Sequence, residues 1–253
     1  AQHEIDFKYG EALETADKIM TYKLTVKTIA KRHGLYASFM PKPKYGMCGS
    51  GMHINMSLFN KEGQNIFVDE NDKNGLSKEA YNFIAGLMKH MRSMTAIINP
   101  IVNSYKRLVP GYEAPTYIAW SATNRSPLIR VPAARGLGTR VELRSPDCAT
   151  NPYLAIAVCL AAGLDGIKNN LQPVDSIQRD IYSMTDEERD EAGIENLPKN
   201  LYEAIQEMRK SDFVKGVLGK EVFKKYIKAK EEEWMEYTSQ VTDWEINKYL
   251  DRI

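Results

Sequence analysis

The sequence predicts an α+β domain: a curved antiparallel sheet backed by helices, with a helical layer at its C-terminal end. Two observations support this. Short strand candidates follow one another in hairpin-like order, and long helical patterns are segregated from them. The 253 residues contain no internal repeat and no flexible linker, so we expect residues 1–253 to form a single domain. Since the chain begins with Ala1 inside structured-looking sequence, we expect an N-terminal part to be missing.

Composition is that of a folded protein, with 43% hydrophobic and 26% charged residues. The net charge of +1 gives no bulk electrostatic reason to bind nucleic acid or an acidic membrane surface. The longest apolar run, "YLAIAVCLAAGL", is shorter than the roughly 18 residues that span a bilayer. Cys48, Cys148 and Cys159 form no CxxC pair, so we expect reduced thiols and a cytoplasmic protein.

The first half of the chain predicts two long helices with strands between them. Residues 10–34 have helical spacing and end at Gly34, which suits a left-handed cap. Residues 35–40 and 51–59 are predicted strands, separated by the loop "PKPKYG", and "NKEGQNIFVDE" predicts a turn with a short return strand. Ser77 then caps a second helix, which Pro100 ends.

The second half begins with "NSYKRLVPGYEAP", which is too rich in Pro, Gly and charge to be regular. Three short strand candidates follow: "YIAWSATN", "LIRVP" and "GTRVELRS". Asn151 as N-cap and Pro152 at the first helical position start a central, mostly apolar helix. Residues 171–197 are polar and predicted to be irregular, and their charged patch "TDEERDE" predicts a solvated surface; amphipathic helices follow Pro198.

Two predicted strands each carry a row of polar side chains on one face, because successive strand residues face opposite sides. The rows are His53, Asn55 and Ser57, and Arg140, Glu142 and Arg144. A half-exposed antiparallel sheet alternates in this way, so solvent is one explanation. The other is the floor of a site, because buried unpaired charges are costly.

The chemistry of these rows favours a metal-assisted site for anionic substrates. A histidine and a carboxylate on neighbouring strands suit a divalent metal, and "QHE" adds another carboxylate. Arginine side chains are also dense between positions 107 and 144: Arg107, Arg125, Arg130, Arg135, Arg140 and Arg144. Their guanidinium groups suit carboxylate and phosphate oxygens, although surface salt bridges are the common alternative. Glu113 lies on a Pro- and Gly-rich loop. Its carboxylate could act as a gate or a general base, or it could be an ordinary loop residue.

The sequence contains no GxxxxGK[ST], GxGxxG or GxSxG motif. Seven segments in order, however, closely resemble the C-terminal catalytic domain of type I glutamine synthetases: "QHEIDFKYG", "MPKP", "GSGMHINMSL", "NSYKRLVPGYEAP", "NRSPLIRVP", "VELRSPD" and "NPYLAIAVCLAAGLDGI". The resemblance implies a ligase that joins ammonia to glutamate through γ-glutamyl phosphate. It implies ATP as co-substrate and two or more Mg²⁺ or Mn²⁺ ions.

The resemblance also implies roles for individual residues. Glu4 matches a ligand of the first metal, and His53 and Glu142 match ligands of the second. Gly49, Arg107 and Arg144 match glutamate-binding positions, and Glu113 matches a flap carboxylate that binds ammonium, removes its proton and shields the acyl phosphate. The nucleotide and phosphate positions are Ser57, Arg125 and Arg130, and we expect Arg125, with Glu113, to be catalytic.

The resemblance is closest to the branch of low-GC Gram-positive bacteria, because no adenylylated-tyrosine segment occurs between residues 170 and 200. Cys48 replaces a more usual Asn. The other first-site carboxylates lie before "QHE" in the family, so we expect the isolated chain to be inactive. Full-length relatives form dodecamers and bind transcription regulators, for which the C-terminal helices are a candidate surface. A γ-glutamyl-amine ligase, a non-catalytic interaction module and a nucleic-acid-binding protein are the alternative readings.

Overall fold

The computed structural model describes residues 2–124 and 126–253 and confirms the α+β class. A four-stranded sheet has the order β1-β5-β4-β3, and a two-stranded sheet pairs β2 with β6. The strands are β1 (Ile54–Met56), β2 (Tyr117–Ile118), β3 (Trp120–Ser121), β4 (Ile129–Arg130), β5 (Val141–Leu143) and β6 (Glu195–Asn196). The pairs β1–β5, β4–β5 and β2–β6 are antiparallel as predicted, whereas β3 and β4 are parallel.

Helices α2 (Lys78–Ile98) and α4 (Pro152–Lys168) form the centre of the hydrophobic core, into which β4 and β5 contribute Ile129, Val141 and Leu143. Both predicted caps are confirmed. Ser77 accepts a hydrogen bond from the Ala80 amide, and Asn151 accepts from two amides of the first turn of α4. A Cβ added at Gly86 would lie 2.1 Å from the Ala162 carbonyl oxygen, so only glycine lets the two backbones approach this closely.

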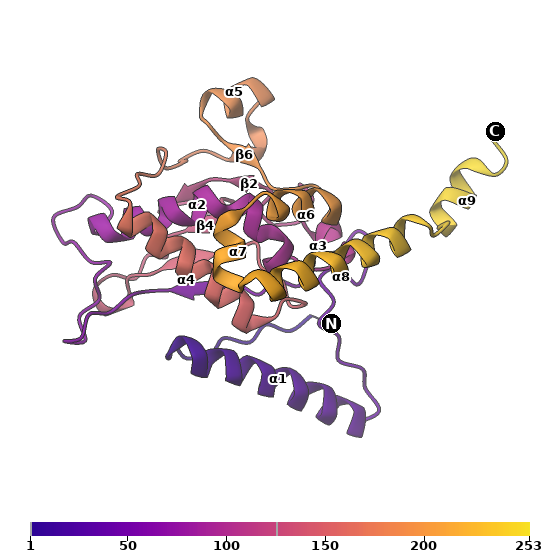
Figure 1. Cartoon of the computed structure of the whole chain (residues 1–253), viewed down its shortest axis with the longest axis horizontal. Coiled ribbons are helices and arrows are strands. Elements are labelled where there is room, and N and C mark those ends of the chain that lie inside the picture. Colours follow the sequence, from indigo (N-terminus) through magenta and orange to yellow (C-terminus); the bar gives the residue numbers. More distant parts are fainter. Residues whose placement is uncertain (1, 125) are drawn as a thin grey trace.

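Helix α1 (Ala12–Arg32) is confirmed, and Gly34 beyond it has a positive φ of 69°. It is as long as α2, but Ala16 is its only buried residue. Figure 1 shows α1 lying along the lower edge, apart from the helical body.

Three predictions about local structure were wrong. Residues 35–40 form no strand, and the strand predicted over residues 51–59 is shortened to β1, flanked by isolated bridges at Gly51 and Phe59. The segment expected to be irregular contains helix α3 (Val102–Arg107), in which the Ser104 hydroxyl accepts from the Ile101 amide. Side-chain caps and contacts between distant segments determine where these short elements form.

The helical C-terminal layer is confirmed. It consists of α6 (Leu201–Arg209), α7 (Asp212–Leu218), α8 (Lys220–Thr238) and α9 (Asp243–Tyr249). Helix α8 leaves the body and carries α9 outward at the C-terminal end (Figure 1). The polar stretch before this layer holds the short helix α5 (Asp186–Glu191), whose side chains are mostly exposed, and the 3₁₀ turn η2 (Ile181–Ser183). A second 3₁₀ turn, η1 (Gly136–Gly138), precedes β5.

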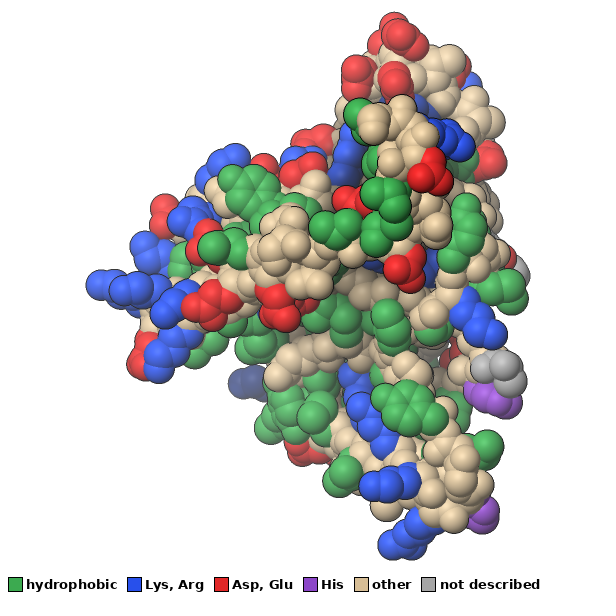
Figure 2. Space-filling model, turned by 90° about the vertical axis from the view of Figure 1, so that its right-hand side faces the viewer, with side chains coloured by type: hydrophobic (Ala, Val, Ile, Leu, Met, Phe, Trp, Pro, Cys, Tyr) green, Lys and Arg blue, Asp and Glu red, His purple; other side chains and the backbone are tan. Residues whose placement is uncertain are grey.

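The surface agrees with the near-neutral charge of the chain. On the face drawn in Figure 2, basic and acidic side chains are interspersed with hydrophobic ones, and acidic groups gather at the upper end. Within the part of the chain that the structure describes, no helix is both long enough and apolar enough to cross a bilayer.

Candidate functional site

The two predicted polar rows meet on one face of the four-stranded sheet. Glu142 on β5 has Asn55 of β1 and Arg130 of β4 as its register partners. Its Oε1 lies 3.1 Å from His53 Nδ1, and its Oε2 lies 2.9 Å from Arg130 Nη1. Arg140 Nε donates to Asn55 Oδ1 at 3.0 Å. We call His53, Asn55, Arg130 and Glu142 the sheet floor, and its close contacts argue against a merely wetted face.

The Glu142 carboxylate is almost buried, with 9% of its side chain exposed. Burial acts to raise its pKa, but the His53 hydrogen bond and the charges of His53, Arg130 and Arg144 outweigh burial and hold the pKa below its ordinary value. The carboxylate is therefore ionised at neutral pH. An ionised carboxylate beside an imidazole is a donor pair that suits Mg²⁺ or Mn²⁺.

The floor fits part of a metal site. His53 and Glu142 present a nitrogen and an oxygen from adjacent strands, and the His53 side chain is 33% exposed. Within residues 2–124 and 126–253, no group of three or more His, Cys, Asp or Glu residues is placed to hold a metal ion. These residues therefore supply two ligands of a site but do not complete it.

Arg107, the last residue of α3, is 4% exposed and lies beneath the "GSG" segment. Its Nη1 donates to the Ser145 carbonyl at 2.6 Å and its Nη2 to the Arg144 carbonyl at 3.1 Å. A Cβ at Gly49 would lie 2.9 Å from Arg107 Cγ, and one at Gly51 would lie 2.5 Å from Nη2. The two glycines thus let the strand backbone pass directly over the guanidinium group.

The N-terminal segment lies against the same strand. Gln2 Nε2 donates to the Gly49 carbonyl at 2.8 Å, across 47 positions of sequence. Glu4 follows two residues later and is exposed. The fold therefore brings "QHE" beside "GSGMH", as a shared site requires, although Glu4 joins no group of candidate metal ligands among the described residues.

Glu113 lies on the loop of residues 108–116, which we call the Glu113 loop. Glu113 is exposed and has a φ of 63°, a left-handed conformation that costs a non-glycine residue about 1 kcal/mol or more. Burial lowers the pKa of the nearby Arg144, while the charge of Glu142 and, more weakly, those of Tyr182 and Glu113 act to raise it.

The remaining predicted residues are less tightly placed. Ser57 is partly buried, one residue beyond the end of β1. Arg125 lies outside the described residues. Arg130, predicted to contact phosphate, uses Nη1 to pair with Glu142.

Sequence reasoning missed two residues that support the site. Tyr182, from the stretch predicted to be polar and irregular, donates from its hydroxyl to the Ala114 carbonyl at 2.9 Å. Asp147 of "VELRSPD" is fully buried; it accepts from Asn99 Nδ2 at 3.0 Å and from the Ala149 amide at 2.9 Å. Burial raises its pKa, against the opposing effect of these hydrogen bonds and Arg107. The sequence signal for Tyr182 was an aromatic residue in a polar stretch. The signal for Asp147 was an acidic residue just after the second polar row.

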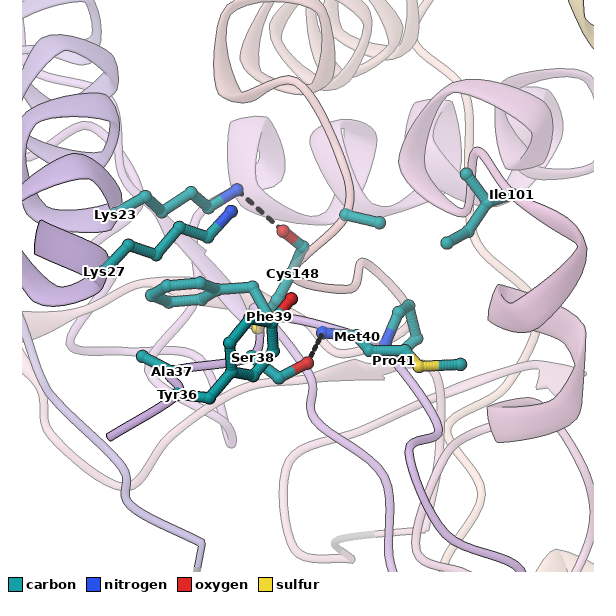
Figure 3. A pocket seen from close by; sticks show the side chains of 11 residues that line it. Lys23, Lys27, Tyr36, Ala37, Ser38, Phe39, Met40, Pro41, Ile101 and Cys148 are labelled. Atoms are coloured by element: carbon teal, nitrogen blue, oxygen red, sulfur yellow. Dashed lines mark hydrogen bonds between the residues drawn. The ribbon is translucent and has the colours of Figure 1, made fainter. Parts of the chain in front are cut away.

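Two cavities adjoin the site without containing it. One, of about 360 Å³, lies between α1 and the segment that leads to Pro41, where Lys23 Nζ donates to the Cys148 carbonyl at 2.7 Å (Figure 3). None of the predicted site residues lines it. The other, of about 600 Å³, lies behind the Glu113 loop and is lined by Val109, Pro110 and Thr116 of the loop, with Arg189 opposite.

Known proteins match nearly the whole chain. The family described as "Glutamine synthetase, catalytic domain" matches residues 1–249. Proteins named glutamine synthetase are 63% identical over 251 residues in Clostridium saccharobutylicum and 56% identical over 253 residues in Methanosarcina mazei. These matches cover 99% and 100% of this chain but 56% of each relative. The chain therefore spans about half the length of these relatives.

Solved structures agree with the sequence matches. The structure described as "GmaS/ADP complex-Conformation 1" has a TM-score of 0.87 at 39% identity and covers 97% of this chain and 56% of that one. "Apo GmaS without ligand" has a TM-score of 0.85 at 40% identity, with coverage of 96% and 55%.

Proposed function

The chain belongs to the glutamine synthetase catalytic-domain family, and from this premise we propose that its 253 residues are the catalytic domain of a longer enzyme that joins ammonia to glutamate using ATP. The observation that carries the proposal is the arrangement of Glu142 between His53 and Arg130. It supports the proposal because it sets a carboxylate and an imidazole that suit a divalent metal beside a guanidinium group that suits phosphate.

Two steps make up the proposed reaction. The γ-phosphoryl group passes from ATP to a side-chain carboxylate oxygen of glutamate, which releases ADP and leaves γ-glutamyl phosphate. The nitrogen of ammonia then attacks the acyl carbon, and phosphate departs with that oxygen. Arg125, Arg130 and Arg144 are the groups we assign to the phosphoryl oxygens, since guanidinium forks match them in shape and charge.

His53 and Glu142 would hold one divalent ion, and Glu4 would contribute to another. When bound, Mg²⁺ or Mn²⁺ neutralises charge on the transferred phosphoryl group. The pairing of Glu142 with Arg130 supports this assignment, because it keeps the carboxylate ionised and aligned toward His53. Ser57 is assigned to the nucleotide side, and the ADP named for the related GmaS structure supports a nucleotide site in this fold.

Glu113 would bind ammonium, take up its proton and keep water from the acyl phosphate. Its exposed position on a loop supports this role, because it leaves the carboxylate accessible. Gly49 and Arg107 are assigned to glutamate. The close passage of the strand over the Arg107 guanidinium supports that pairing.

The test uses two proteins: the 253-residue chain, and a chimera in which this chain replaces the matching segment of the Clostridium saccharobutylicum relative. We expect ATP-dependent glutamine formation by the chimera and none by the isolated chain, which lacks a complete set of metal ligands among its described residues. Methylamine and a polyamine, offered in place of ammonia, test the amine-ligase alternative. A chimera that folds but forms no glutamine contradicts the proposed function.

Assembly and regulation form a further part of the proposal. The full-length enzyme would be a cytoplasmic dodecamer, and the surface of α8 and α9 would bind a protein regulator. The exposed Trp244, Ile246 and Leu250 support such a surface. Removal of the residues after Asp243 from the chimera tests it, and unchanged binding of a candidate regulator would exclude the tail.

A further inference from the structure

We propose that Lys42 is a positioning residue that fixes the Glu113 loop by placing its ammonium group against the ring of Tyr112. The inference deepens the proposed function and rests on it for the role of Glu113. Lys42 belongs to the "MPKP" segment, 71 positions before Glu113, and touches none of the assigned substrate groups in the described structure.

Hydrogen bonds to two other segments hold the backbone at Lys42. Its amide donates to Asn103 Oδ1 at 2.7 Å, and Asn103 Nδ2 donates back to its carbonyl at 3.0 Å. The preceding carbonyl, of Pro41, accepts from the Ser50 amide at 2.8 Å. Lys42 is thus tied to α3 on one side and to the "GSG" segment on the other.

The side chain is unusual for a lysine because the residue is only 8% exposed. Its Nζ donates to the Met47 carbonyl and lies 3.6 Å from the centroid of the Tyr112 ring. Among the residues that the structure describes, it forms no ion pair with a carboxylate. A buried ammonium group needs compensation, and here the negative face of an aromatic ring provides it. Displacing Tyr112 would leave the cation with one carbonyl.

The two ends of the Glu113 loop are anchored in the body of the domain. Leu108 and Ala114 are buried in the hydrophobic core, and the Thr116 carbonyl accepts from the Leu197 amide at 2.9 Å.

Between these ends, Gly111 and Glu113, on either side of Tyr112, both have positive φ angles, of 90° and 63°. The cavity of about 600 Å³ beside the loop offers room for this part to move. Tyr182 donates to the Ala114 carbonyl. Lys42 therefore restrains the loop just before Glu113, and Tyr182 restrains it just after.

The direct test is limited proteolysis of the 253-residue chain with chymotrypsin, which cleaves after Tyr112 when the loop opens. We expect cleavage there to be about tenfold faster in Lys42→Met, close to wild type in Lys42→Arg, which retains a cation, and unchanged in Lys44→Met. Lys44 is the matched control, an exposed lysine two residues later in the loop "PKPKYG". Cleavage after Tyr9, which is 93% exposed, is the internal reference.

Two outcomes overturn the inference. Equal cleavage after Tyr112 in wild type and Lys42→Met would mean that the cation does not hold the loop. Faster cleavage throughout Lys42→Met, including after the buried Phe83, would mean that Lys42 supports the whole fold rather than this loop.

A second test uses the chimera and separates positioning from general support. Lys42→Met and Tyr112→Leu should each raise the KM for ammonium about tenfold and release more phosphate than glutamine, while the double variant is no worse than either single variant. Additive effects overturn the inference. If the unsubstituted chimera forms no glutamine, the proposed function is what fails, and the proteolysis result still decides whether Lys42 holds the loop.

Discussion

Two carboxylates of the site, Glu142 and Glu113, are held in opposite ways. Glu142 is fixed by a strand register, is almost buried and has a partner on each oxygen. Glu113 is exposed, has a strained backbone and depends on contacts made by its neighbours Tyr112 and Ala114. Under the proposed function, this difference assigns phosphoryl transfer to the fixed floor and the selection of the group that attacks the acyl phosphate to the Glu113 loop.

The largest expected effect is on the floor. Glu142→Gln in the chimera should lower both ADP formation and glutamine formation on the order of a thousandfold, because it removes a charged oxygen of the proposed metal site and the negative charge that pairs with Arg130. The matched control is Glu195→Gln, an exposed strand residue on β6. Measuring ADP and glutamine in one assay checks this, and retained ADP formation would show that Glu142 acts elsewhere.

The same assay on the loop should give a different pattern. Glu113→Gln should lower glutamine formation about a hundredfold, since the proposed general base is lost, but it should lower ADP formation much less, because the floor remains intact. Phosphate would then exceed glutamine. Equal losses of both products would remove the distinction between floor and loop.

A smaller effect is expected from a substitution that frees the C-terminal end of the Glu113 loop. Tyr182→Phe removes the hydrogen bond to the Ala114 carbonyl, which is worth about 1 kcal/mol, so the KM for ammonium should rise about fivefold. The rate at saturating ammonium should change little. Tyr202→Phe, a half-exposed tyrosine on α6, is the control, and an equal change there would indicate a nonspecific effect.

The smallest effect is on stability and tests the strain at Glu113. Asparagine tolerates a positive φ better than glutamate or glutamine. Glu113→Asn should therefore raise the free energy of unfolding of the 253-residue chain by about 0.5 kcal/mol, and Glu113→Gln should leave it unchanged. Urea unfolding measures both. Identical values would mean that the loop relieves the strain in another way.

The floor could largely be predicted from the sequence, whereas the supports of the loop could not. Alternation along a strand predicted that His53 and Asn55 share one face, and that Arg140 and Glu142 share one face. The register of β1 with β5 brings these two rows together. Lys42, Tyr182 and Asp147 carry no such periodic signal, because contacts between segments far apart in the chain determine their roles. The short helix α3 was missed for a different reason: its local cap, a hydrogen bond from the Ile101 amide to the Ser104 hydroxyl, lies in a segment whose Pro, Gly and charged residues predicted irregular structure.

The most direct measurement follows oxygen from glutamate in the chimera. With ¹⁸O in the side-chain carboxylate of glutamate, we expect one ¹⁸O atom in the phosphate released for each glutamine formed, because that oxygen leaves with the phosphoryl group. Phosphate that carries no ¹⁸O, formed together with glutamine, would contradict the acyl-phosphate route and the division between floor and loop built on it.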